Sequence, residues 1–205
     1  TPKYGTLTIT SLPDDAKYEV EVTAASADVL YDGSEQSVSG FNDGTESGGD
    51  IAVTAGGHNF TVSGLSAEAK ATNAGNYPVN ITGDYKVEDE DGNDVTSQFK
   101  VNMVPGSLNI AKRSVTMTSE SASKKYNGKA LTAGKVEVSG DGFANGEGAD
   151  YNVTGTQTLV GMSDNTFTYT LKEGTIDANY DIKTNYGTLT VTNRDAKYGI
   201  TLRPK

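Results

Sequence analysis

One short segment, present three times, constrains the fold of this chain more than any other feature. Each copy has a glycine followed by Leu and Ile or Val, which alternate with small polar residues. This period of two places the apolar pair on one face of a half-buried strand. A strand that recurs in this way is typical of the closing strand of a repeated domain. The three copies are Tyr4–Thr10, Pro105–Ala111 and Tyr186–Thr192.

The spacing of the copies predicts the size of the repeats. Gly5 and Gly106 are 101 residues apart, and Gly106 and Gly187 are 81 apart. Both spacings are near the ~100 residues of a small β-sandwich, which can bury a core of its own. Because the chain begins within a repeat, we expect it to be a fragment of a longer exported protein. The expected divisions are a closing strand of a preceding repeat (1–10), a first repeat with longer loops (11–111), a second repeat (112–192), and the start of a further repeat or an extra edge strand (193–205).

Composition and turn signals favour an all-β fold for both repeats. Only 35% of the residues are hydrophobic, and the abundance of Gly, Thr, Ser, Asn and Asp suits short strands joined by tight turns. Tyr31-Asp32-Gly33 and Tyr126-Asn127-Gly128 each predict such a turn. We expect both tyrosines to pack as core, with their hydroxyls reaching water or backbone. Further strands are expected at Ala16–Val22, Asp50–Thr54, Asn59–Ser63, Ala67–Thr72, Tyr77–Thr82, Ser114–Thr118, Lys135–Ser139, Tyr151–Thr156, Thr166–Leu171 and Tyr180–Lys183.

The two repeats can be aligned at two further places. Asn73–Tyr77 resembles the turn at which many immunoglobulin-like sandwiches place a tyrosine corner, and Ser163–Phe167 aligns with it. The Phe in the second copy could not make the corner hydrogen bond. Val95–Val101 then aligns with Ile176–Ile182. This alignment predicts nine extra residues in the first repeat, in a lengthened hairpin around Glu88–Asp94.

Charge and cysteine content restrict the partners of the chain. The net charge is −10 and there is no cysteine. An acidic surface repels phosphate backbones, so we expect no nucleic-acid binding. No apolar run reaches the ~20 residues that a membrane-spanning helix needs. A small secreted animal domain would often carry disulfides, so their absence favours a bacterial surface protein.

The paired turns, the hairpin Asp91–Thr96 and the terminal strand Tyr186–Val191 resemble the immunoglobulin-like repeats of large Gram-positive surface proteins, in particular the MBG-type domains. The resemblance implies tandem immunoglobulin-like β-sandwiches, with β-grasp-like repeats as the alternative fold. It also implies an extracellular, cell-wall-associated protein whose repeats form the stalk of an adhesin, and it supplies no catalytic residues. We expect a monomeric, non-enzymatic structural module without a cofactor.

The alternative function is a binding module for a host glycan or host protein. The Gly-rich loops 41–58 of the first repeat, and 141–150 of the second, would supply the contacts. An exposed group of aromatic and polar side chains on the first repeat would distinguish this module from a stalk.

Few side chains in the sequence indicate chemistry. His58 is the only histidine and lies between Gly57 and Asn59 in a turn-like setting, so we expect a solvated residue and no catalytic triad. Asp89, Asp91 and Asp94 could supply oxygens to calcium, although their spacing does not fit an EF-hand loop. Lys, Asn and acidic side chains buried together can form isopeptide bonds in related domains, but no spacing identifies such a triad.

Overall fold

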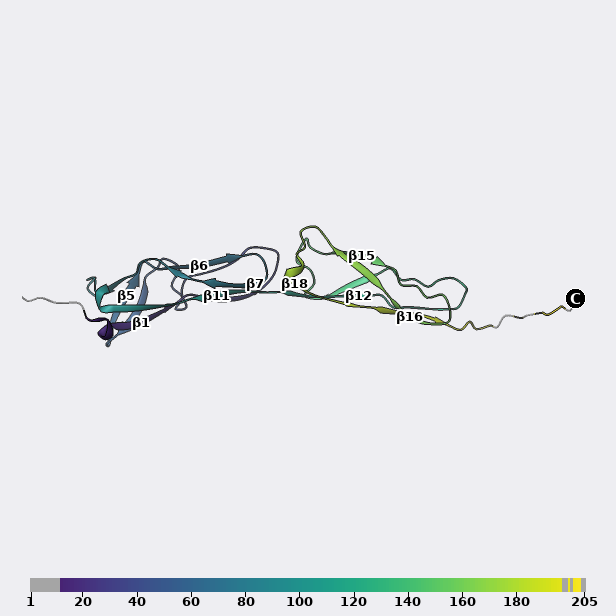
Figure 1. Ribbon diagram of the computed structural model, residues 1–205, viewed down its shortest axis with the longest axis horizontal. Coiled ribbons are helices and arrows are strands. Elements are labelled where there is room, and N and C mark those ends of the chain that lie inside the picture. The colour runs from purple at the N-terminus through teal and green to yellow at the C-terminus, as the bar shows by residue number, and fades with distance from the viewer. Residues whose placement is uncertain (1–11, 197–198, 200, 204–205) are drawn as a thin grey trace, which may run out of the picture. The chain divides into compact units, whose positions relative to one another are not determined.

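The computed structural model describes residues 12–196, 199 and 201–203 (Figure 1). In these residues it contains strands and three single-turn 3-10 helices, η1 (Asp14–Ala16), η2 (Thr96–Gln98) and η3 (Asp177–Asn179), and no α-helix. The predicted all-β class is therefore confirmed. The chain divides into two compact units, which we call unit 1 (Thr1–Val29 with Ser34–Ala111) and unit 2 (Leu30–Gly33 with Lys112–Lys205).

Unit 1 is built from short strands in four small sheets. The orders are β1-β10, β2-β11-β7, β3-β6-β8 and β4-β5-β9. Pro78, which cannot donate a ladder hydrogen bond, lies in β7 at the edge of its sheet, where proline is tolerated. The strands are β1 (Tyr18–Thr23), β2 (Ala27–Leu30), β3 (Gln36–Ser39), β4 (Ile51–Ala55), β5 (His58–Ser63), β6 (Ser66–Ala71), β7 (Gly75–Val79), β8 (Ile81–Thr82), β9 (Lys86–Asp89), β10 (Phe99–Val104) and β11 (Gly106–Ala111).

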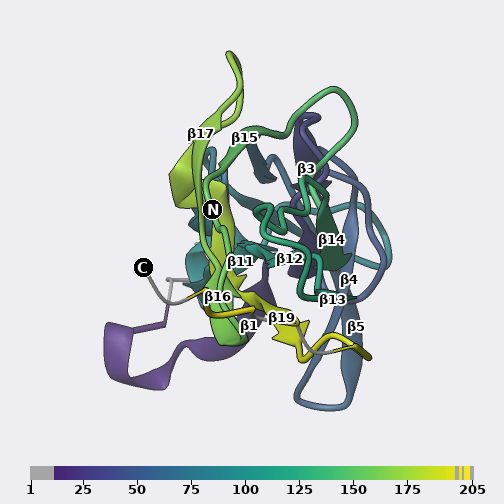
Figure 2. The same cartoon turned by 90° about the vertical axis from the view of Figure 1, so that its right-hand side faces the viewer.

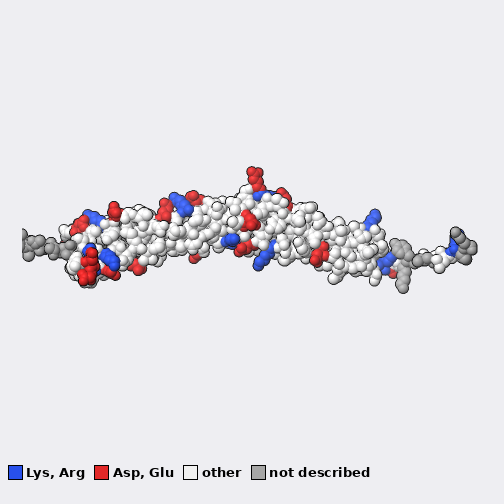
Figure 3. Space-filling model, viewed as in Figure 1, with Lys and Arg blue, Asp and Glu red and all other residues white. Residues whose placement is uncertain are grey.

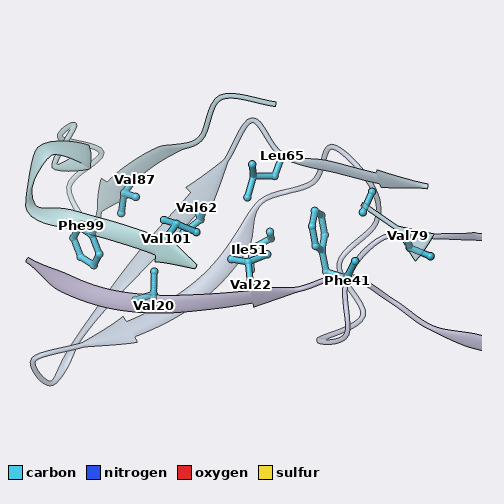
Figure 4. Close-up of a cluster of buried hydrophobic side chains, with 12 residues drawn as sticks. Val20, Val22, Phe41, Ile51, Val62, Leu65, Val79, Val87, Phe99 and Val101 are labelled. Carbon is cyan, nitrogen blue, oxygen red and sulfur yellow. The ribbon is translucent and has the colours of Figure 1, made fainter. Parts of the chain in front are cut away.

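The core of unit 1 is formed by side chains that alternate along these strands. Val20 and Val22 of β1 point toward Ile51 of β4, Val62 of β5 and Phe99 of β10 (Figure 4). Burying an aliphatic or aromatic side chain of this size contributes about 1.5–3 kcal/mol. The polar residues between them face solvent, which is the pattern that the period of two predicts.

Unit 2 has three sheets, with orders β14-β12-β18, β13-β19-β16 and β15-β17; the last is visible at the top of Figure 2. The predicted burial of the closing strands is confirmed, since Leu108 and Ile110 in unit 1 and Leu189 and Val191 in unit 2 are all at most 2% exposed. The strands are β12 (Arg113–Ser119), β13 (Ala122–Lys125), β14 (Val136–Gly140), β15 (Ala149–Val153), β16 (Gly161–Asn165), β17 (Phe167–Leu171), β18 (Tyr180–Asn185) and β19 (Gly187–Thr192).

Each strand predicted within the described residues overlaps an observed one, but one alignment between the repeats is wrong. Val79 of β7 lies opposite Gly106, and Asn165 of β16 lies opposite Gly187. Tyr77 therefore corresponds to Ser163 and not to Phe167, a shift of four residues. From Val79 to Phe99 is 20 residues and from Asn165 to Tyr180 is 15, so unit 1 has five extra residues here and not nine.

Two predicted segments lie wholly or partly outside the described residues. The expected closing strand of a preceding repeat at 1–10 lies outside them entirely. In the last segment, the described residues 193–196, 199 and 201–203 form no strand. The choice between a further repeat and an edge strand there stays a prediction.

Candidate functional site

In each unit, a strand near the start pairs in parallel with a strand near the end. In unit 1, β1 pairs with β10 from Tyr18 opposite Phe99 to Thr23 opposite Val104. In unit 2, β12 pairs with β18, and β13 pairs with β19, both in parallel. Partners in unit 2 are 67 residues apart in both ladders, as in Arg113 with Tyr180 and Ala122 with Leu189. The register therefore continues from one ladder into the next, across the short interruption between them. We call this interruption the break; in unit 2 it separates β12 from β13 and β18 from β19.

A serine hydroxyl bridges the two strands at each break. In unit 1 the Ser107 amide donates to Ser26 Oγ at 3.0 Å, and in unit 2 the Thr188 amide donates to Ser121 Oγ at 2.9 Å. These bonds replace ladder bonds where the strands bend from one sheet into the next. The strand pair is thus held across the break as well, where each of these exposed hydrogen bonds contributes about 0.5–1.5 kcal/mol.

The repeated glycine that marks the closing strand allows a close approach of backbone at this break. A Cβ on Gly106 would lie 2.0 Å from the carbonyl oxygen of Ala25, and one on Gly187 would lie 2.3 Å from that of Ser119. No side chain fits at either distance, since non-bonded atoms separate by about 3.5 Å. The glycine in the repeated motif is required by packing between strands that are far apart in the sequence.

The two units fill the space beside this glycine differently. Unit 1 places the apolar residues Ala24 and Val79 there, both 0% exposed. Unit 2 has buried Ser119 and Asn165 at the corresponding positions. Ser119 Oγ donates to the Asn165 carbonyl at 2.5 Å and accepts from the Gly187 amide at 3.0 Å. Asn165 Nδ2 donates to two backbone carbonyls at 2.9 Å, whereas its Oδ1 is buried without a donor.

A carboxylate held by two tyrosines forms a second polar cluster in unit 2. Glu147 accepts a hydrogen bond of 2.5 Å from the Tyr31 hydroxyl and one of 2.8 Å from Tyr180. The two rings pack edge to face with centroids 5.7 Å apart. Burial, which disfavours the phenolate, and the nearby Glu147 carboxylate together raise the pKa of Tyr180 to about 12. Tyr31 is buried as expected, but its hydroxyl reaches a carboxylate and not water or backbone.

A polar groove of about 580 Å³ lies against the outer face of β12 and β18. Its lining includes Ser114 and Thr116 from β12, Asp181 and Lys183 from β18, and Tyr169 from β17. In the parallel ladder, Ser114 is opposite Asp181 and Thr116 is opposite Lys183, so these four side chains share one face. Asp177, Tyr180 and Ile182 complete the lining.

The structure does not assemble Asp89, Asp91 and Asp94, the candidate calcium ligands, into a metal site. Asp89 Oδ1 already accepts from the backbone amides of Asp91 and Asn93, at 3.0 and 2.8 Å, and hydrogen bonds from Asn93 lower the pKa of Asp89. Asp94 instead accepts from the Thr96 amide at 3.0 Å. Within the described ranges, no three acidic or histidine side chains are placed to hold a metal ion. His58 is exposed, as expected, but it is the first residue of β5, directly after the turn at Gly56 and Gly57, and lies opposite Ala55 of β4.

The loops proposed for glycan binding expose no aromatic platform. The single Phe, Tyr or Trp in 41–58 is Phe41, which is 4% exposed, and in 141–150 it is Phe143, which packs on Tyr180 with centroids 5.1 Å apart. Charged side chains on the face shown in Figure 3 lie in small separate groups. No lysine occurs among the buried polar residues of the described chain, which are Ser119, Asn165 and Asn179, so no buried isopeptide triad forms there.

The sequence did predict the hydrogen bond of the Tyr77 hydroxyl in unit 1, which donates to the Asn73 carbonyl at 3.0 Å. Sequence reasoning missed the groove, because the lining residues come from three strands and from η3, and no sequence motif joins them. It also missed Glu147 as the partner of two tyrosines. The only available signal for Glu147 was an acidic residue in the Gly-rich segment 141–150.

No protein-family model, curated protein or solved structure matches this chain. Among the helices of the described residues, none is long and apolar enough to cross a membrane.

Proposed function

We propose that both units are structural modules that carry tension between their ends, as stalk repeats of an adhesin-like protein on a bacterial cell surface. The observation that carries this proposal is the parallel pairing, in each unit, of a strand near the start with a strand near the end. Because paired strands run in the same direction, the chain enters a unit at one end of the pair and leaves it at the other. A force on the two ends then shears the pair.

Shear loads many hydrogen bonds at once, whereas peeling breaks them one after another. The β1–β10 ladder has six residue pairs, and the strands continue as β2 and β11. The bridge from Ser107 to Ser26 and the hydrogen bond of 3.0 Å from Asn109 Nδ2 to Asp28 extend the same register past the break. The exposed ion pair of Lys100 with Glu19, at 2.7 Å, adds little at ordinary salt concentrations.

For the finer fold we propose an immunoglobulin-like β-sandwich in each unit, with β-grasp-like repeats as the alternative. The tyrosine corner at Tyr77 and the packing of side chains from separate sheets around Phe99 support the sandwich. The parallel terminal strands are compatible with both folds.

A pulling experiment on single molecules tests the function directly. The chain has no cysteine, so two introduced cysteines provide unique attachment points. In the full chain, Lys17→Cys with Ala111→Cys loads β1 and β11 in shear. Lys17→Cys with Lys100→Cys loads the start of the same strand pair in peeling and is the matched control.

We expect a several-fold higher unfolding force in shear than in peeling at the same pulling speed. Equal forces in the two geometries would refute a tension-bearing role. Surface biotinylation of intact cells that make the protein tests its proposed location, and labelling only after lysis would contradict it.

A further inference from the structure

The polar groove of unit 2 has features of a binding site that the structural role does not use. Tyr169 forms one side of it and is 36% exposed. Tyr18 and Tyr186 are also exposed, but each packs on a neighbouring phenylalanine ring, Tyr18 on Phe99 and Tyr186 on Phe167, with centroids 5.5 and 5.6 Å apart. Tyr169 has no ring partner in the part of the chain that the structure describes.

The groove also presents polar groups that the protein itself leaves unused. Among the described residues, the side chains of Asp177, Asp181 and Lys183 have no hydrogen-bond or ion-pair partner, although all three line the groove. Ser114 is different, because its Oγ donates to Asp141 at 2.7 Å. These unpaired groups include both hydrogen-bond donors and hydrogen-bond acceptors, so they suit a ligand whose own groups can both donate and accept hydrogen bonds.

We propose that this groove binds a neutral saccharide. Each sugar hydroxyl donates and accepts, which matches Lys183 as donor, Asp177 and Asp181 as acceptors, and Thr116 as both. The C–H face of a sugar ring can pack on the exposed ring of Tyr169. Two carboxylates against one ammonium make the groove net negative, which disfavours sialylated or sulfated sugars. The volume of about 580 Å³ is in the ordinary range for a ligand pocket.

An extended peptide added to the edge of β18 is the competing occupant, because β18 is the outer strand in the order β14-β12-β18. A peptide strand at that edge would hydrogen-bond to β18 alone. The groove instead continues across β18 to Ser114 and Thr116 of β12, which lies on the inner side of β18. This position favours a ligand that lies on the face of the sheet.

The test is an NMR titration of the ¹⁵N-labelled full chain with chitotriose, maltotriose and N-acetyllactosamine, each up to tens of millimolar. We expect one or more of them to shift the amide signals of Thr116, Tyr169, Asp181 and Lys183. Tyr169→Ala should weaken binding of that sugar at least about tenfold, which is about 1.4 kcal/mol. Asp181→Asn, which keeps the side-chain shape, should also weaken it.

Tyr186→Ala is the matched control, because Tyr186 is 47% exposed in unit 2 but lies outside the groove. It should leave the affinity unchanged. The proposal is overturned if none of the three sugars shifts these signals, or if Tyr186→Ala weakens binding as much as Tyr169→Ala does. Tighter binding of sialyllactose than of its neutral counterpart, or binding of an extended peptide without any sugar, would also overturn it.

Discussion

Replacing Gly187 with alanine should open the paired strands of unit 2 at their break. A Cβ at this position would lie 2.3 Å from the Ser119 carbonyl oxygen and 2.6 Å from both the carbonyl carbon and oxygen of Glu120. All of these atoms belong to the backbone, so no side chain can swing away. The strands would have to separate by about 1 Å to reach ordinary contact.

The cost can be worked out from the contacts at the break. Overfilling a packed interior costs about 1–3 kcal/mol. Separation also weakens the hydrogen bonds from Gly187 N to Ser119 Oγ and from Thr188 N to Ser121 Oγ, at about 1 kcal/mol each. Alanine also lowers the conformational entropy of the unfolded chain, which stabilises the folded state by about 0.4–1 kcal/mol. We expect a net loss of about 2–5 kcal/mol in the free energy of unfolding of unit 2.

Gly134→Ala is the matched control in the same unit, because a Cβ added at Gly134 would meet no atom within 4 Å and its φ is not in the left-handed region. It should change stability by less than about 1 kcal/mol. Urea unfolding of the full chain, followed by hydrogen exchange and mass spectrometry of peptides from β12, β13 and β19, assigns each loss to its unit. If Gly187→Ala costs no more than Gly134→Ala, the close-approach reasoning is wrong.

Three further outcomes are expected. The folded-state pKa of Tyr180, about 12, lies above its ordinary value of 10. The stability that this shift contributes to unit 2 is therefore fully present below pH 10 and falls by up to ~3 kcal/mol as pH rises through 12. Urea titrations at several pH values should show this fall, and Tyr180→Phe should flatten it. Tyr77→Phe removes the bond to the Asn73 carbonyl and should destabilise unit 1 by about 0.5–1.5 kcal/mol in thermal melts, whereas Tyr126→Phe, which loses no such bond, should not. Millimolar calcium should leave the melting temperature unchanged, because Asp89 already accepts from backbone amides; a rise would restore the calcium hypothesis.

Local patterns in the sequence predicted local structure well. The alternation of Leu and Ile or Val in the closing strands predicted their burial, and the Asp-Gly and Asn-Gly turns have the expected positive φ at Gly33 and Gly128. The alignment of Val95–Val101 with Ile176–Ile182 is confirmed, since both segments contain a 3-10 turn followed by a buried aromatic residue that begins a strand.

The pairing of strands could not be predicted, because partners lie 67 or 81 residues apart and tertiary packing selects them. For the same reason the sequence did not explain the repeated glycine, because the constraint on Gly106 and Gly187 comes from backbone that lies far earlier in the sequence. The alignment of Tyr77 with Phe167 failed because the neighbouring strand segments have similar polar composition. Only the ladder opposite Gly187 fixes their register.

The parallel terminal strands also decide when each unit can fold during synthesis. β10 and β11 pair with residues made 81 positions earlier, and β18 and β19 with residues made 67 positions earlier. A ribosome that still holds these last strands withholds one partner of the parallel ladders, so those ladders cannot yet form. Each unit closes only after its final residues are released, and a nascent chain stopped before its closing strand has no route to the native state.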